Sequence, residues 1–159
     1  MRRGTIFSIL KGILLIVFAF LLAGRIFQPT DSDKPLTEIS AQTLKDIDML
    51  SMVEKTPNDV KLFLQLNPGD YKEIVYYKSD DVMQPSEILI VHFNSRDQYD
   101  PFESAITSHV NSQANIFEGY APEQYELTQS AMIQRYGNYG IFVIHPNAPV
   151  IYSQFRKGL

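Results

Sequence analysis

The sequence predicts an α+β fold, in which an N-terminal transmembrane helix is followed by one small domain. The prediction rests on an unbroken apolar run near the N-terminus, two pairs of strand-like segments joined by turns, and helical segments around them. Two hairpins separated by helices favour a mainly antiparallel four-stranded sheet with helices packed on one face. We therefore expect a signal anchor at residues 1–27, a polar stalk at 28–38 and a domain at 39–159.

The anchor prediction depends on the apolar stretch Thr5–Gly24. As a helix, its roughly 20 residues would be about 30 Å long, which matches the hydrocarbon core of a bilayer. A cleaved signal peptide and a buried core helix are the alternatives, but the best cleavage site, at residues 21–23, has only one of the two small residues required. Basic residues precede the run, so we expect the N-terminus in the cytoplasm, residues 5–24 in the lipid bilayer and the domain outside.

The first part of the expected domain contains two helices. The polar residues 28–35 include two prolines and have no apolar period, which is typical of a stalk. Ser40 is expected to cap a short helix, and residues 49–53 fit either its end or a short strand. Residues 56–59 (TPND) are typical of a helix start with proline in the first position, so a second helix is expected as far as Leu66.

Two hairpins and a long helix follow. Residues 71–78 and 86–93 are rich in β-branched and aromatic side chains, and we expect them to pair through the loop at 79–85. Asp100 is expected to cap the long helix, which ends at Gly119. A second helix begins at Pro122, a second hairpin joins 132–136 to 141–145, and a last helix opens near residue 147 or 149.

Composition excludes several classes of function. Beyond Gly24 the chain has 11 basic and 18 acidic residues, a formal charge of −7, so we expect no nucleic-acid partner. The absence of cysteine excludes disulfides, thiol catalysis and cysteine-ligated metals.

The sequence contains no pattern typical of catalysis. The three histidines, His92, His109 and His145, lack a metal-ligand spacing, and two of them lie near strand ends, where partly exposed polar residues are common. No nucleophile elbow, phosphate-binding glycine loop or zinc-protease motif is present. We therefore expect no metal, no cofactor and no catalytic residue, and hence a protein that is not an enzyme.

Several segments together resemble a bacterial family of domains of unknown function. The resemblance lies in residues 64–71 (LQLNPGDY), Tyr76–Tyr77, Met83, Glu87, Gln113, 116–120 (IFEGY), 122–124 (PEQ) and 137–139 (GNY). It implies a protein tethered outside a Gram-positive-type cell, with no known activity, and an accessory role in surface-polysaccharide modification. His109 departs from the arginine more usual in relatives, so any pairing of that position with an acidic group is expected to be weaker or pH-dependent here.

These observations favour a membrane-anchored, extracytoplasmic, non-catalytic module that binds another protein of the cell envelope. Tyrosine combines an apolar ring with a polar tip and suits such contacts. The candidate binding residues are Tyr120, Gln124, Tyr125, Gln113 and Tyr139. A domain that senses a small ligand or a glycan is the alternative, a cryptic enzyme is a third reading, and the oligomeric state is open.

Overall fold

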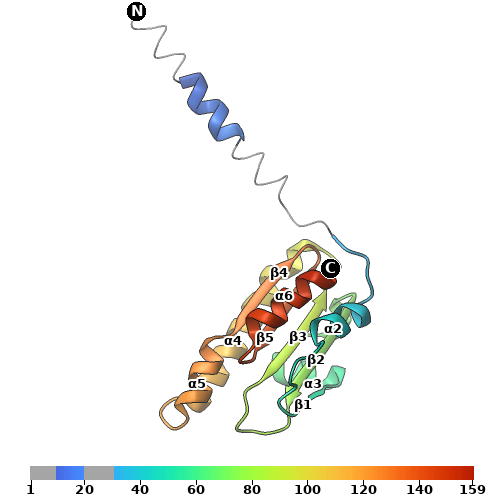
Figure 1. Cartoon of the computed structure of the whole chain (residues 1–159), viewed down its shortest axis with the longest axis vertical. Helices are drawn as coiled ribbons and strands as arrows, with labels where there is room; N and C mark the ends of the chain where they lie inside the picture. The colour runs from blue at the N-terminus through green and yellow to red at the C-terminus, as the bar shows by residue number, and fades with distance from the viewer. Residues whose placement is uncertain (1–9, 20–30) are drawn as a thin grey trace, which may run out of the picture. The chain divides into compact units, whose positions relative to one another are not determined.

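A computed structural model describes residues 10–19 and 31–159 (Figure 1). The chain forms two units, Met1–Thr30 and Asp31–Leu159, and in the first of them residues 10–19 are helical. Among the described residues, no helix combines the length and the apolar character needed to cross a membrane. This finding contradicts the transmembrane helix of the predicted fold. The remainder of the predicted anchor, and its boundary with the stalk, lie outside the described residues.

The second unit is built on a five-stranded antiparallel sheet. Its strands lie in the order β1 (Met52–Glu54), β2 (Glu73–Ser79), β3 (Glu87–His92), β5 (Tyr139–Ile144) and β4 (Met132–Tyr136). Both predicted hairpins are present, but the prediction of four strands is wrong. The additional strand, β1, has three residues and pairs with the far half of β2, where Met52 lies opposite Ser79. Of the two alternatives left open for residues 49–53, the short strand is thus correct in part, because β1 begins at Met52.

Helices cover both faces of the sheet, so the prediction that they pack on one face is also wrong. Figure 1 shows α2 (Leu36–Thr43) and α6 (Ala148–Gly158) in front of the strands. The other face is covered by α3 (Pro57–Leu64) and α4 (Tyr99–Phe117), and α5 (Pro122–Gln129) packs on α4. The reason lies in β3 and β5, in which every residue is buried. Strands that are apolar on both sides need cover on both sides.

Two apolar clusters hold these layers together. On the first face, Ile39, Ile151 and Phe155 pack against Ile88 and Ile90 of β3. On the second face, Leu64, Phe102 and Ile106 pack against Leu89 and Val91. Each of these side chains is at most 1 % exposed. Successive residues of β3 thus contribute to opposite clusters, as the pleat of a strand requires.

The helix ends agree with the sequence in part. The predicted start of α3 is confirmed, with Thr56 as its cap in a capping box with Asp59, and Gly119 has the positive φ of 84° that ends α4. The predicted caps at Ser40 and Asp100 are wrong, because both residues lie inside their helices. A short 3₁₀ turn at Arg96–Gln98 leads directly into α4, and another at Pro68–Asp70 precedes β2.

Candidate functional site

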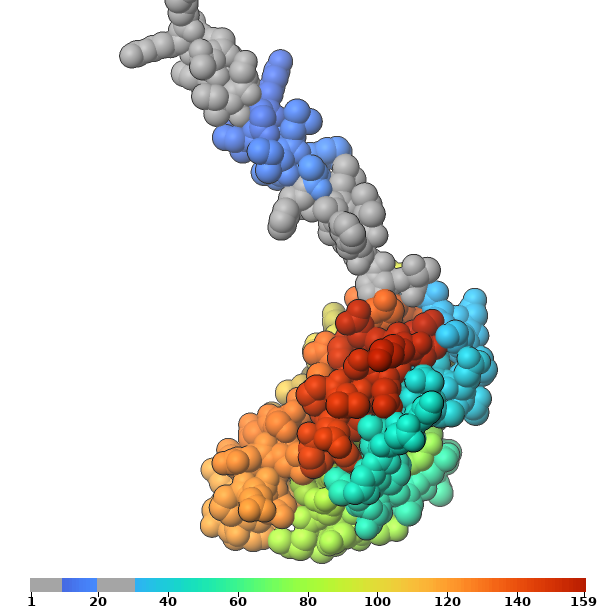
Figure 2. Space-filling view, in the orientation of Figure 1, coloured from blue at the N-terminus to red at the C-terminus, as the bar shows by residue number. Residues whose placement is uncertain are grey.

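A pocket of about 200 Å³ opens at one end of the domain, between α3, α4 and the loop that joins β2 to β3. Its walls include two aromatic rings, Phe63 and Phe117, and the polar side chains of Lys55, Lys78 and Gln113. Figure 1 and Figure 2 show the β2–β3 loop and α5 at this end, whereas the segment that precedes α2 lies at the opposite end.

Exposed apolar side chains surround this pocket. They come from α3, the β2–β3 loop, the last turn of α4 and the turn that follows it, and we call them the loop-end surface: Phe63, Val82, Met83, Ile116 and Tyr120. Val82 is 87 % exposed, and Ile116 and Tyr120 are both more than half exposed. On α4, Gln113 and Ile116 are three residues apart and share one helical face. Tyr120 follows the end of the helix, and its N–H donates to the Phe117 carbonyl at 3.3 Å.

The structure brings four of the five predicted binding residues to this end of the domain. Gln113 lines the pocket, and the ring of Tyr120 lies 6.2 Å from that of Phe117. Gln124 and Tyr125 follow on α5 and are half-buried. Tyr139 lies elsewhere, because it starts β5 opposite His92, while the loop end of β5 is at Ile144, opposite Glu87.

A buried ionic cluster lies beneath the pocket, around the carboxylate of Glu87. Tyr76 Oη donates to Glu87 Oε2 at 2.8 Å, and His109 Nε2 donates to the same oxygen at 2.8 Å. Lys78 forms an ion pair with Glu87 Oε1. Glu87 is fully buried. Position 109 thus has an acidic partner, Glu87, and the expectation that this pairing is weaker or pH-dependent stays a prediction.

The protonation state of this cluster follows from its surroundings. Burial acts to raise the pKa of Glu87, but the hydrogen bond and charge of His109, together with Lys78, outweigh it and hold the pKa below its ordinary value. Burial and the adjacent Glu87 carboxylate raise the pKa of Tyr76, which therefore stays a donor. Both carboxylate oxygens are occupied by donors, so Glu87 has no face turned to solvent.

The cluster lies between two openings. Lys78 lines the larger pocket and also lies over the ring of Phe63, with its Nζ 5.7 Å from the ring centroid. His109 lines a smaller pocket of about 110 Å³ between α3 and α4. A ligand at the loop-end surface would thus approach Lys78, while the carboxylate stays covered.

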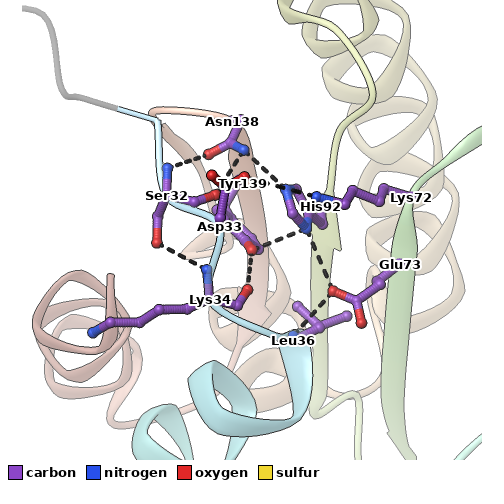
Figure 3. Close-up of polar contacts among 9 residues, drawn as sticks. All are labelled: Ser32, Asp33, Lys34, Leu36, Lys72, Glu73, His92, Asn138 and Tyr139. Atoms are coloured by element: carbon purple, nitrogen blue, oxygen red, sulfur yellow. Dashed lines mark hydrogen bonds and ion pairs between the residues drawn. The ribbon is translucent and has the colours of Figure 1, made fainter.

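A second polar centre lies at the opposite end of β3, around His92 (Figure 3). The imidazole is stacked on the Tyr139 ring at 4.1 Å between centroids. Asn138 Nδ2 is 2.8 Å from His92 Nε2, and Tyr139 Oη is 2.9 Å from His92 Nδ1. Burial and the charges of Glu73 and Asp33 raise the pKa of Tyr139 to about 12, so its hydroxyl keeps its proton.

The sequence analysis missed most of these polar partners. His92 and His145 are at most 3 % exposed, so the expectation of partly exposed side chains is wrong. Glu87 carried a signal that was not used, because it is the one charge in the otherwise apolar strand 87–91, and such a charge needs partners. Asn138 carried none, since asparagine is ordinary in a hairpin turn.

Metal-ligating side chains do not gather in the part of the chain that the structure describes: no group of three or more histidines and carboxylates is found there. The expectation that the protein holds no metal or cofactor stays a prediction.

Comparison with known proteins gives one match. A domain of unknown function, DUF4358, matches residues 45–145, which include all five strands and α3 to α5. No curated protein and no solved structure matches the chain. The match confirms the resemblance to an uncharacterised domain family but does not test the expected bacterial origin. Because the match covers more than half of the sequence, the chain belongs to the DUF4358 family.

Proposed function

We propose that this domain is a non-catalytic module that binds another protein through the loop-end surface. The observation that carries the proposal is the group of exposed apolar side chains, contributed by three elements, around one pocket. Isolated exposed apolar residues are ordinary, but a cluster beside polar groups is typical of an interaction site. The protruding Val82 and Tyr120 supply the apolar area, and Lys78 and Gln113 supply donors beside it.

The shape of the site favours a protein over a small molecule. Ligand pockets usually enclose about 300–1,000 Å³, and the pocket here measures about 200 Å³. Tyr120 is 59 % exposed, and Val82, in the wall of the pocket, is 87 % exposed, so both present most of their surface to solvent. A partner surface with a small apolar side chain at its centre would fill the pocket and cover its rim.

The polar cluster supports a non-catalytic role. Glu87 is the one carboxylate held with a histidine, a tyrosine and a lysine among the described residues, and its oxygens are occupied by these neighbours. A general acid or base must reach a substrate within hydrogen-bond distance. Glu87 cannot do so without dismantling its own contacts, so the cluster serves to fix α4 to the sheet.

Photo-cross-linking tests the proposal in cells that produce the full-length protein. We replace Val82, Tyr120 or Val150 with a photoreactive phenylalanine analogue and identify the cross-linked proteins by mass spectrometry. Val150 is a matched control, because it is 49 % exposed but lies on α6, on the other face of the sheet. We expect one protein, tested first among envelope proteins, to be captured from positions 82 and 120 and not from 150.

The affinity of the purified partner for variants of the domain is then measured. We expect Val82→Asp and Ile116→Asp each to weaken binding at least about tenfold, as the loss of an interface anchor does. Val150→Asp, the same chemical change on α6, should leave the affinity unchanged. Equal capture from all three positions, or equal affinities for all three variants, would contradict the proposal.

A groove on the other face is the observation that favours the ligand-sensing alternative. It measures about 350 Å³ between α2 and the edge of the sheet, and its lining includes Tyr77, Glu54 and Glu73. That volume is within the range of ligand sites. A thermal-shift screen with envelope glycans tests it, since a ligand at 100 times its Kd stabilises by about 2.7 kcal/mol. A shift that is abolished by Tyr77→Ala would favour this function.

A further inference from the structure

Residues 31–33, which we call the latch segment, are bound to the hairpin turn between β4 and β5. Ser32 N–H donates to Asn138 Oδ1 at 2.9 Å, and Asn138 Nδ2 donates to the Ser32 carbonyl at 2.9 Å (Figure 3). A backbone N–H can only donate and a backbone carbonyl can only accept. The two bonds therefore fix which way the Asn138 amide points.

The fixed amide in turn determines where the proton of His92 lies. Asn138 Nδ2 is also 2.8 Å from His92 Nε2, and because Nδ2 is a donor, Nε2 must accept and carries no proton. Tyr139 Oη donates to the carbonyl of Lys34, so it accepts from His92 Nδ1–H at 2.9 Å. The neutral imidazole with its proton on Nδ1 is the form that satisfies every group in this chain of bonds.

We propose that protonation of His92 detaches the latch segment from the domain. A proton on Nε2 would point at the Asn138 amide hydrogens, and two donors cannot bond. Rotating the amide by half a turn would bring Oδ1 to the imidazolium, but it would set Nδ2 against the Ser32 N–H and Oδ1 against the Ser32 carbonyl. The rotated amide loses both bonds to Ser32, and the unrotated amide holds its donor against that of the imidazolium, so neither arrangement keeps all the bonds of the neutral form.

Charged and polar groups face the His92 ring from the elements packed around it. From β2, Glu73 Oε2 lies 3.4 Å from His92 Nδ1 and also accepts from Leu36 N–H at 3.0 Å. Lys72 on β2 faces Asp33 of the latch segment at 3.9 Å. From β5, the Tyr139 hydroxyl faces His92. The Lys34 ammonium, from the segment before α2, does not face His92, because it donates to the Gly158 carbonyl at 2.6 Å. Glu73 thus gives a protonated His92 a counter-charge at Nδ1. At Nε2, Asn138 can accept a hydrogen bond only if its amide rotates and gives up its two bonds to Ser32.

In the part of the chain that the structure describes, two exposed ion pairs remain at residues 31 and 33 once Ser32 is free. Asp31 pairs with Arg96 at 3.0 Å and Asp33 with Lys72, and the side chains in both pairs are about half exposed or more. Exposed pairs of this kind contribute little and weaken with salt. Release of three residues would lengthen the connection to the domain by about 10 Å. This release of the latch segment does not depend on the loop-end surface, which lies at the other end of β3.

Amide exchange at Ser32 tests the proposal. We record hydrogen exchange by NMR on the full-length protein at pH 7.5 and 5.0, correct for the intrinsic rates, and use the Leu89 amide of β3 as the internal reference. We expect the protection of the Ser32 amide to fall about tenfold or more at pH 5.0, as the loss of two ordinary hydrogen bonds gives. Unchanged protection of Ser32 would overturn the proposal.

Three variants separate the mechanism from general loosening in acid. His92→Gln cannot gain a proton, so Ser32 protection should be the same at both pH values, whatever its level. In Asn138→Asp, the carboxylate accepts from both Ser32 N–H and a protonated His92, so protection should not fall at pH 5.0. His145→Gln, a control at another buried histidine, should respond as the unmodified protein does. A tenfold fall in His92→Gln would also overturn the proposal.

Discussion

Glu87 is a fully buried carboxylate that depends on its neighbours for hydrogen bonds and counter-charge. Its carboxylate is removed from water, and three donors from two elements compensate for the lost hydration: Tyr76 and Lys78 from β2, and His109 from α4. Breaking a buried ion pair by removing one partner is costly, because the remaining charges stay buried without compensation. We therefore expect the free energy of unfolding to depend on the negative charge of Glu87.

We expect Glu87→Gln to lower the free energy of unfolding by about 3 kcal/mol, because Lys78 and His109 lose their counter-charge while the shape is kept. Urea unfolding followed by circular dichroism measures this. Glu126→Gln, the same change at an exposed position on α5, should stay within about 0.5 kcal/mol of the unmodified protein. Equal effects of the two substitutions would show that the buried charge is not a source of stability.

The same carboxylate predicts a pH dependence. The pKa of Glu87 is lower in the folded protein than its ordinary value of 4.5, so its contribution is present above pH 4.5 and is lost as the pH falls through the folded value. We expect the free energy of unfolding to drop less between pH 5 and pH 3 in Glu87→Gln than in the unmodified protein. The pKa values of Asp59 and Asp97 are also lowered, but these residues remain in both proteins and cancel in the comparison. Parallel pH profiles would contradict the assignment.

At the scale of one element, β5 depends on having no side chain at Gly140. A Cβ there would lie 2.7 Å from Phe93 Cζ and 3.3 Å from Phe102 Cε1. The Phe93 ring cannot move aside, because it is 2 % exposed and packs edge-on against Phe102, with 5.4 Å between the ring centroids. β5 and α4 can approach each other this closely only beside glycine.

We expect Gly140→Ala to destabilise the fold by about 1–3 kcal/mol through overpacking. Gly69→Ala is the control, since a Cβ at Gly69 meets its nearest atoms at 3.8 Å, which is ordinary contact. Thermal unfolding of the two variants side by side measures the difference. If Gly140→Ala were as stable as Gly69→Ala, the Phe93 ring would have room that the structure does not give it.

Local patterns predicted the elements well where neighbouring residues decide them, and less well elsewhere. The hairpin of β2 and β3 and the end of α4 at Gly119 follow from strand composition and turn residues. The start of α4 was misplaced, because the Ser95–Gln98 capping box begins a turn before the more familiar Asp100–Pro101 signal. Cover on both faces was missed, although the uninterrupted apolar run of β3 indicates it.

The sequence predicted the candidate site only in part, as it did the elements. Gln113 lies on α4 and Tyr120 directly after its predicted end at Gly119, so one correctly predicted helix brings both to the same end of the domain. The sequence did not predict that Tyr139 lies apart from the other four, because its partner His92 is 47 residues away and only the register of β3 with β5 brings the two together. Contacts of that range follow from tertiary packing, for which a single sequence gives no local signal.

At the scale of the whole molecule, the family match and the folding unit have different extents. The match covers residues 45–145, but α2 and α6 lie outside it and cover one face of the sheet. Ile39 on α2 and Ile151 and Phe155 on α6 are fully buried. Removing the two helices would expose Ile88 and Ile90 to water on the central strand.

We therefore expect a fragment of residues 45–145 to lack a cooperative unfolding transition and to bind a hydrophobic dye, as a domain with an uncovered core face does. A fragment of residues 31–159 should unfold in one sharp transition. Differential scanning calorimetry of the two fragments measures this. A cooperative transition in the shorter fragment would mean that α2 and α6 are accessory to the core.

The contact between Lys34 and the carbonyl of Gly158 has a practical consequence. The chain enters and leaves the domain at neighbouring points, an arrangement that lets a domain be inserted into a host protein or circularly permuted with a short joining peptide. A reporter protein fused after Leu159 would stand beside the entry point and leave the β2–β3 loop uncovered (Figure 1). The C-terminus is thus the attachment point from which this domain can be immobilised on a sensor chip with its proposed binding end facing the solution.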